Sequence, residues 1–138
     1  MSNSETLYHV SSKIEIKPSG VHGLGVFANQ TIEEKETIEV SRLLRLGWRM
    51  KYQYDNVIRD YCWTPSCKCN ECQMHGTAMY IALGFGSLYN HSDTPNTNVK
   101  LDYNNLTLLV TANKTINAGE EIFVTYGESY WKSRTKST

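Results

Sequence analysis

The chain has 138 residues, 40% of them hydrophobic, and this length suits one domain with a real core. Fourteen basic and fourteen acidic residues cancel, so no global field steers nucleic acid and no direct nucleic-acid binding is predicted. No apolar stretch approaches a membrane span, and the polar first five residues do not resemble a secretory signal. Four cysteines without such a signal predict an intracellular, reducing compartment, with thiols free or bound to metal.

Most of the chain has the pattern of short strands. Period-2 alternation and short β-rich runs predict strands, in chain order, at 13–17, 25–28, 37–40, 98–103, 106–112 and 122–126. Asn104-Asn105 predicts a hairpin between the fourth and fifth of these. Helices are predicted at 49–61 and at 77–83, the second stopped by Gly84. The fold class is therefore mostly β (α+β), with a short helical insert, in one domain covering 1–138.

The most informative segment runs from Leu88 to Asn96, where Asn-His-Ser is followed by Pro-Asn. It comes directly after an apolar run at 81–83 and two glycines. Polar groups at the edge of a core need hydrogen-bond partners, because each unpaired group costs roughly 1–3 kcal/mol. These side chains either pair among themselves in a tight loop or are held ready for a ligand.

Two further clusters can be read in two ways. Gly23-Leu24-Gly25 lets a backbone approach a ligand closely, although a hairpin turn explains it equally well. A tyrosine-rich set suits either a small core or a cationic guest, since aromatic faces stabilise ammonium groups. Its members are Tyr61, Tyr89, Tyr126 and Tyr130.

For the pair Glu120-Glu121, at a turn before a strand, we expect a solvated face.

The cysteines form the fourth candidate. Cys67, Cys69 and Cys72, with Cys62 or His75 as a fourth ligand, would complete a tetrahedral zinc site. Four protein ligands leave no open position for water, so such a zinc ion would be structural. Free cysteines also serve as small apolar fillers, and that reading stays open.

Three motifs occur in order: Gly-Leu-Gly-Val-Phe-Ala, Tyr-Asn-His-Ser-x-x-Pro-Asn and Gly-Glu-Glu-Ile-x-Val-x-Tyr-Gly. Together they resemble the SET-domain family of protein lysine methyltransferases, and most of all its small stand-alone viral and bacterial members. The resemblance covers about 13–131. It implies a β-clip-like fold of small curved sheets with a C-terminal pseudoknot, and an insert at about 45–80 that carries the cysteine cluster.

The resemblance also implies roles for individual residues. The methyl donor would be S-adenosylmethionine, contacted by Gly23, Leu24, Gly25, Asn90, His91 and Trp131. Tyr126 matches the catalytic tyrosine. The channel for the target lysine would be lined by Tyr61, Tyr89, Val124 and Tyr130.

The chemistry of the implied reaction suits these residue types. The lysine must lose its proton, which costs on the order of 4–5 kcal/mol at neutral pH. A neighbouring sulfonium and an apolar channel lower the pKa of the amine, so no dedicated base is required. A tyrosine two positions before Tyr126 could restrict turning of a methylated lysine, but Val124 cannot, so we expect multiple methylation.

Asp93 marks a departure from the family pattern. Many members have cysteine there and three more after the last motif, but this chain has none after Cys72. The C-terminal tail or a second subunit, as in a homodimer, would then cover the channel. The implied partner is a protein or peptide presenting a lysine, with histone tails the common target. The alternative is a catalytically silent SET-like module, stabilised by zinc, that binds peptides.

Overall fold

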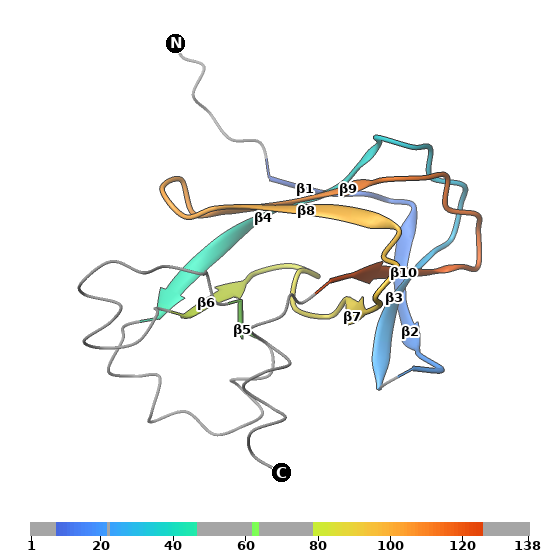
Figure 1. The fold of residues 1–138 in the computed structure, drawn as a ribbon, viewed down its shortest axis with the longest axis horizontal. Helices are drawn as coiled ribbons and strands as arrows, with labels where there is room; N and C mark the ends of the chain where they lie inside the picture. The colour runs from blue at the N-terminus through green and yellow to red at the C-terminus, as the bar shows by residue number, and fades with distance from the viewer. Residues whose placement is uncertain (1–7, 22, 47–61, 64–78, 126–138) are drawn as a thin grey trace.

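The computed structural model describes residues 8–21, 23–46, 62–63 and 79–125. These residues form ten strands and no helix, which confirms the mostly β class (Figure 1). The strands are β1 (His9–Val10), β2 (Ile14–Pro18), β3 (Leu24–Ala28), β4 (Thr37–Leu46), β5 (Cys62–Trp63), β6 (Met79–Ala82), β7 (Asn90–His91), β8 (Thr97–Asp102), β9 (Thr107–Ala112) and β10 (Glu121–Val124).

The larger sheet has six strands in the order β5-β6-β4-β9-β8, with β1 paired to the first half of β4. The predicted hairpin at Asn104-Asn105 is confirmed, since β8 and β9 pair antiparallel from Thr97↔Ala112 to Asp102↔Thr107. Asp102 Oδ1 accepts the backbone N–H groups of both asparagines, at 3.0 Å each. This side-chain capping explains why a polar Asp-x-Asn-Asn segment reverses the chain here.

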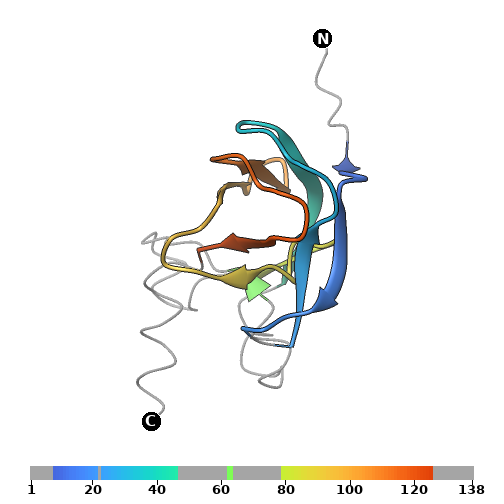
Figure 2. The same ribbon diagram turned by 90° about the vertical axis from the view of Figure 1, so that its right-hand side faces the viewer.

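The smaller sheet has four strands in the order β2-β3-β10-β7. β2, β3 and β10 are antiparallel neighbours, whereas β7 runs parallel to β10. The sheet stands across one end of the larger sheet in Figure 1, and Figure 2 shows the same arrangement turned by 90°. The two sheets thus curl around one core, and β10 also contacts β8.

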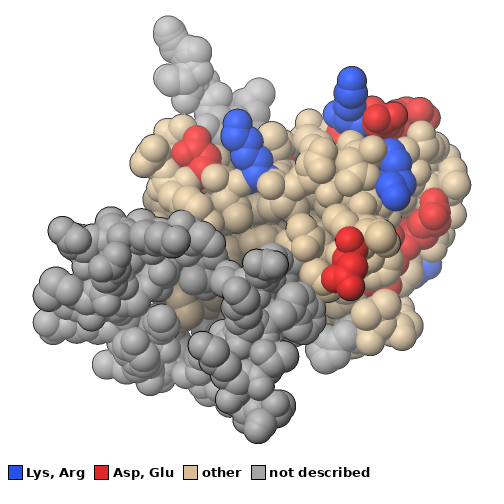
Figure 3. All heavy atoms as spheres, viewed as in Figure 1, with Lys and Arg blue, Asp and Glu red and all other residues tan. Residues whose placement is uncertain are grey.

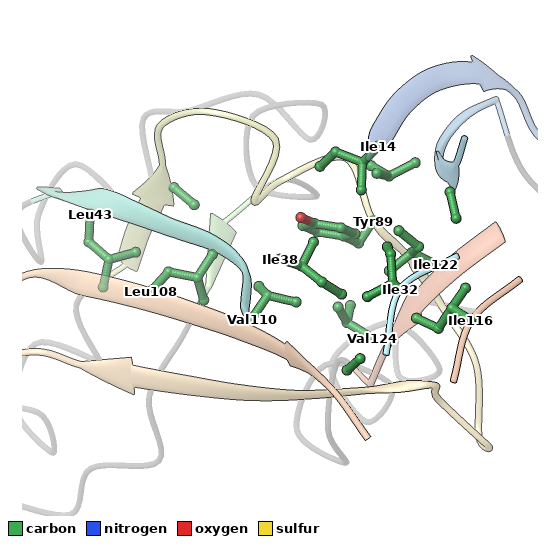
Figure 4. Close-up of a cluster of buried hydrophobic side chains, with 14 of the residues drawn as sticks. Ile14, Ile32, Ile38, Leu43, Tyr89, Leu108, Val110, Ile116, Ile122 and Val124 are labelled. Carbon is green, nitrogen blue, oxygen red and sulfur yellow. The ribbon is translucent and has the colours of Figure 1, made fainter. Parts of the chain in front are cut away.

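The core fills the space between the two sheets, and Figure 4 shows part of it. Its largest fully buried side chains are mostly aliphatic, as expected where alternating strand residues meet face to face. They include Ile32, Ile38, Leu43, Leu108, Ile116, Ile122, Val110 and Val124, together with the ring of Tyr89. Gly86 belongs here too, because a Cβ on it would lie 2.5 Å from both Ala82 Cβ and Leu108 Cδ2.

The helix predicted at 77–83 is wrong for Met79–Ala82, which form strand β6. β6 pairs antiparallel with β4, from Leu43↔Ala82 to Leu46↔Met79, and with β5 on its other side. Four residues cannot hold an isolated helix, whereas β4 pairs with all four residues of β6 and β5 pairs with Tyr80 and Ile81. Gly84 does end the segment, with φ +97°. The other predicted helix, 49–61, and most of the insert at 45–80 lie outside the described residues.

Acidic and basic side chains are interspersed over the coloured part of the face in Figure 3. In the described ranges, no helix is long and apolar enough to cross a membrane.

Candidate functional site

The three sequence motifs come together at β10. On one side β10 pairs with β3, through Glu121↔Phe27 and Ile122↔Val26. On the other it pairs with β7, through Phe123↔Asn90 and Val124↔His91. The N–H of Ser92 extends this ladder by donating to Val124 O at 3.0 Å. Segments from the start, middle and end of the chain therefore lie side by side.

Asn90 is held at this junction with only 6% of its surface exposed. Its Nδ2 donates to the backbone oxygen of Leu24 at 3.2 Å and to Glu121 Oε2 at 2.8 Å. Because both partners are acceptors, the amide nitrogen of Asn90 must face them, and its oxygen Oδ1 must point away from them. The orientation of this amide is therefore set by β3 and β10 together.

Gly25 allows this contact to form. A Cβ on Gly25 would overlap Glu121 Oε2 and would lie 3.1 Å from Asn90 Nδ2. Gly23 has a different role, because it is exposed and takes φ +50°, which favours glycine. In the Gly-Leu-Gly motif, Gly23 therefore allows a turn, and Gly25 allows the Glu121 and Asn90 side chains to approach the backbone. The side chain of Leu24, between the two glycines, is exposed.

Glu121 is the residue that the sequence interpretation missed. We expected a solvated face, yet its carboxylate is half-buried and accepts hydrogen bonds from Asn90 Nδ2 and from Ser19 Oγ. The Ser19 contact measures 2.8 Å to Oε1 and 3.0 Å to Oε2. Strand alternation offered one signal, since Glu121 must face away from the core-facing Ile122. It gave no indication of the partners.

The Pro-Asn part of the central motif explains how β10 is secured. Asn96 Nδ2 donates to Glu121 O at 2.9 Å, and Asn96 Oδ1 accepts the Phe123 N–H at 2.8 Å. Thr97 Oγ1 adds a bond to Phe123 O at 2.8 Å. The asparagine side chain thus replaces a strand as the partner of the β10 backbone. Part of the polar motif is satisfied within the fold.

His91, at the end of β7, contacts the exposed Asp93. His91 Nε2 lies 3.0 Å from Asp93 Oδ1. The Asp93 side chain is 97% exposed, so an ion pair here adds little to stability. The contact still limits the orientation of the imidazole ring.

Tyr89 and Val124, both predicted for the lysine channel, lie in the hydrophobic core. Tyr89 is 1% exposed, and its hydroxyl donates to Glu39 Oε1 at 2.5 Å. Burial, then the charge of Glu39 and this hydrogen bond, raise the pKa of Tyr89 well above its ordinary value. The hydroxyl is therefore protonated at neutral pH and acts as a donor. A role of either side chain in a channel stays a prediction.

The remaining predicted residues lie outside the described part of the chain. They are Tyr61, Tyr126, Tyr130 and Trp131, and the candidate metal ligands Cys67, Cys69, Cys72 and His75. Cys62 is described, and is half-buried in β5. Within the described ranges, no three His, Cys, Asp or Glu side chains gather as a metal site would require.

Comparison with known proteins places these motifs in one family. A family model for the SET domain matches residues 23–127. The histone-lysine N-methyltransferase of Schizosaccharomyces pombe specific for H3 lysine 37 is 28% identical over 124 residues, which cover 88% of this chain and 78% of that protein.

Solved structures show the same similarity. A candidate histone methyltransferase from Plasmodium falciparum superposes with a TM-score of 0.64 at 28% identity, covering 88% of this chain and 99% of that one. A SET-domain histone lysine methyltransferase of Neurospora gives a TM-score of 0.60 at 18% identity, covering 83% of this chain and 52% of that one. At the latter identity the likeness concerns the fold alone.

Proposed function

This chain belongs to the SET-domain family and is a protein-lysine methyltransferase, and we propose that it transfers methyl groups from S-adenosylmethionine. The observation that carries the proposal is the junction of Gly25, Asn90 and Glu121. There, the Asn90 amide has a fixed orientation, because Gly25 lets the Glu121 carboxylate approach and accept from its nitrogen. Its oxygen is thereby held as an oriented acceptor, which suits the ammonium part of a zwitterionic amino-acid group.

In this proposal each residue of the chain has a limited task. Asn90 and the backbone of Gly23–Gly25 would hold the amino-acid end of the donor, while His91 and Trp131 would hold the adenosine end. S-adenosylmethionine supplies, when bound, a methyl group on a sulfonium that a neutral amine can attack. Tyr126 would orient the lysine, and the apolar surroundings would lower the pKa of its amine. Alignment of the two reacting groups would then lower the barrier by roughly several kcal/mol.

Two measurements test this function. Isothermal titration of the full chain should show S-adenosylmethionine binding at one site, and labelled donor with histones should yield methylated lysine. Tyr126→Phe should retain donor binding and suppress transfer. A protein that binds peptide but neither binds the donor nor transfers methyl groups would instead be the silent SET-like interaction module.

We also propose that the product carries more than one methyl group. Val124 stands two positions before Tyr126, and its side chain offers no hydroxyl that could restrain a methylated amine. Mass spectrometry of a histone peptide under enzyme excess should then show dimethyl and trimethyl products. A reaction that stops at the monomethyl peptide contradicts this.

The substrate and setting are proposals of the same kind. The S. pombe relative is named for H3 lysine 37, and a histone tail or another protein that presents a lysine is the substrate we propose here. A homodimer would cover the channel where later cysteines are missing, and light scattering of the purified chain tests this. We propose an intracellular location, which microscopy of a tagged chain would check.

A further inference from the structure

A buried carboxylate lies close to the segment that leads into β7, and none of the roles assigned so far includes it. Glu39 in β4 is 0% exposed. In the described part of the chain no cation pairs with it, and three donors surround it: Ser41 Oγ, the Phe85 N–H at 2.9 Å and the Tyr89 hydroxyl at 2.5 Å. A carboxylate out of water must be bonded in this way, because unpaired it would be strongly destabilising.

A β-bulge turns this side chain inward. The pairing of β4 with β9 shifts register between Thr37↔Thr111 and Glu39↔Val110, so two steps on β4 match one on β9. Neighbouring residues Ile38 and Glu39 are consequently both fully buried, which simple alternation forbids. Bulges commonly re-aim a side chain close to a functional site.

The chain at Gly84 is built around the carboxylate. Gly84 has φ +97°, and a Cβ on it would lie 2.6 Å from Glu39 Oε2 and 3.0 Å from Ser41 Oγ. The next residue, Phe85, donates its backbone N–H to the same oxygen. One carboxylate therefore holds the start of segment 84–90 through a backbone amide and its end through a tyrosine hydroxyl.

The end of that segment is the proposed donor site. Tyr89 directly precedes Asn90, and along an extended chain neighbouring side chains point to opposite sides. The Tyr89 ring is anchored in the core (Figure 4), while Asn90 faces Leu24 O and Glu121. Holding the tyrosine hydroxyl thus limits the rotation and sliding of the strand that presents Asn90.

We propose that Glu39 is a positioning residue that holds segment 84–90, through the Tyr89 hydroxyl and the Phe85 amide, so that Asn90 and His91 stay in register for the methyl donor. This inference rests on the proposed function for its last step. Its first step, immobilisation of β7 by Glu39, concerns the protein without ligand. The two steps can be measured separately.

The variants are chosen to leave the shape of the core intact. Glu39→Gln keeps the volume and removes the charge, and Tyr89→Phe keeps the ring and removes the hydroxyl. Tyr103→Phe is the matched control, since it removes the same atom from a tyrosine whose ring packs against Tyr80, with centroids 4.6 Å apart. Ser41→Ala is the second control, because it removes a donor to the same carboxylate and keeps both hydrogen bonds that join Glu39 to segment 84–90.

Hydrogen exchange of the ligand-free protein should show faster exchange at 90–92 in Glu39→Gln and Tyr89→Phe, and unchanged exchange there in both controls. The Kd for S-adenosylmethionine should rise at least fivefold in the first pair and stay within twofold in the controls. Should Glu39→Gln not fold, Tyr89→Phe carries the comparison.

Unchanged exchange at 90–92 in Tyr89→Phe overturns the inference, as does an equal Kd increase in Ser41→Ala, which would indicate general loss of stability. If the unmodified protein binds no donor, the proposed function fails instead, and the exchange experiment still decides whether Glu39 holds β7.

Discussion

Asn90 donates a 2.8 Å hydrogen bond to Glu121, 31 positions further along the chain, and this bond ties the central motif to the last strand. Ser19 donates to the same carboxylate, so the turn after β2 is joined to it as well. The position of the Asn90 amide thus depends on a residue that resembles an ordinary surface glutamate in the sequence.

Replacing Glu121 by glutamine should weaken donor binding more than it weakens the fold. The variant keeps the length of the side chain but loses the charge that makes these hydrogen bonds strong. We expect the Kd for S-adenosylmethionine to rise about fivefold, or roughly 1 kcal/mol, in calorimetric titration. Glu120→Gln is the control, because Glu120 is exposed on the adjacent turn and should leave the Kd unchanged. Equal effects of the two substitutions would show that general charge, rather than the Asn90 contact, matters.

Gly25→Ala should disturb the same contact between Asn90 and Glu121 by steric overlap. The added methyl group would overlap Glu121 Oε2, and the carboxylate must swing away from Asn90 and Ser19 to admit it. We expect a loss of donor affinity greater than tenfold, about 1.4 kcal/mol, with the protein still folded. Gly20→Ala is the matched control, since nothing lies within 4 Å of its Cβ position. Normal binding by Gly25→Ala would remove Glu121 from the site.

Asn96→Asp should destabilise the fold at β10. The exchange replaces the Nδ2 donor with a carboxylate oxygen that faces the backbone oxygen of Glu121. A half-buried acceptor without a donor typically costs about 1–3 kcal/mol, and repulsion adds to that. Urea denaturation should report the loss as a lower midpoint with an unchanged slope. The exposed Asn98 in β8 is the control, where Asn98→Asp should stay within about 0.5 kcal/mol.

Glu36 should contribute to stability at neutral pH and lose that contribution in acid. Its pKa is lowered by the Glu33 backbone N–H at 3.0 Å and by Lys13, whose Nζ lies 3.0 Å from Oε2. A carboxyl whose folded pKa lies below its unfolded pKa stabilises the protein above the unfolded pKa. That contribution disappears as the pH falls through the folded value.

Denaturation of the unmodified protein and Glu36→Gln between pH 7 and pH 2 checks this. The variant should be less stable at pH 7, and the two curves should converge at the acid end. Glu34→Gln, at an exposed position of the same turn, should follow the unmodified protein throughout. If the difference in stability between the unmodified protein and Glu36→Gln persists or widens in acid, the pKa of Glu36 is not lowered by folding.

Elemental analysis can decide whether the cysteine cluster binds zinc. If Cys67, Cys69 and Cys72 bind structural zinc with Cys62 or His75, purified protein should contain one zinc per chain. Cys67→Ser should then lose the metal and lower the melting temperature. Zinc well below stoichiometric amounts, together with unchanged stability of Cys67→Ser, would favour cysteines that merely fill space.

The local pattern of the sequence determined much of the fold. Alternation located β2, because a strand with one buried face carries an apolar side chain at every second residue. Short β-rich runs located β3 and the start of β4, and Asn104-Asn105 located the β8–β9 hairpin. The order of the three motifs indicated the family, since each contains glycines or polar residues that an ordinary strand or turn does not require. Local signals of this kind need no knowledge of what the strand lies against.

Only the tertiary structure decided the rest. Met79–Ala82 is a strand because β4 and β5 flank it, and four residues carry no period that could distinguish a strand from a helix. Glu121 and Glu39 became part of the site through contacts with Ser19, Asn90 and Tyr89, which are far away in sequence. Such partners depend on strand register and on a bulge, and these are set by how whole strands pair rather than by any one segment.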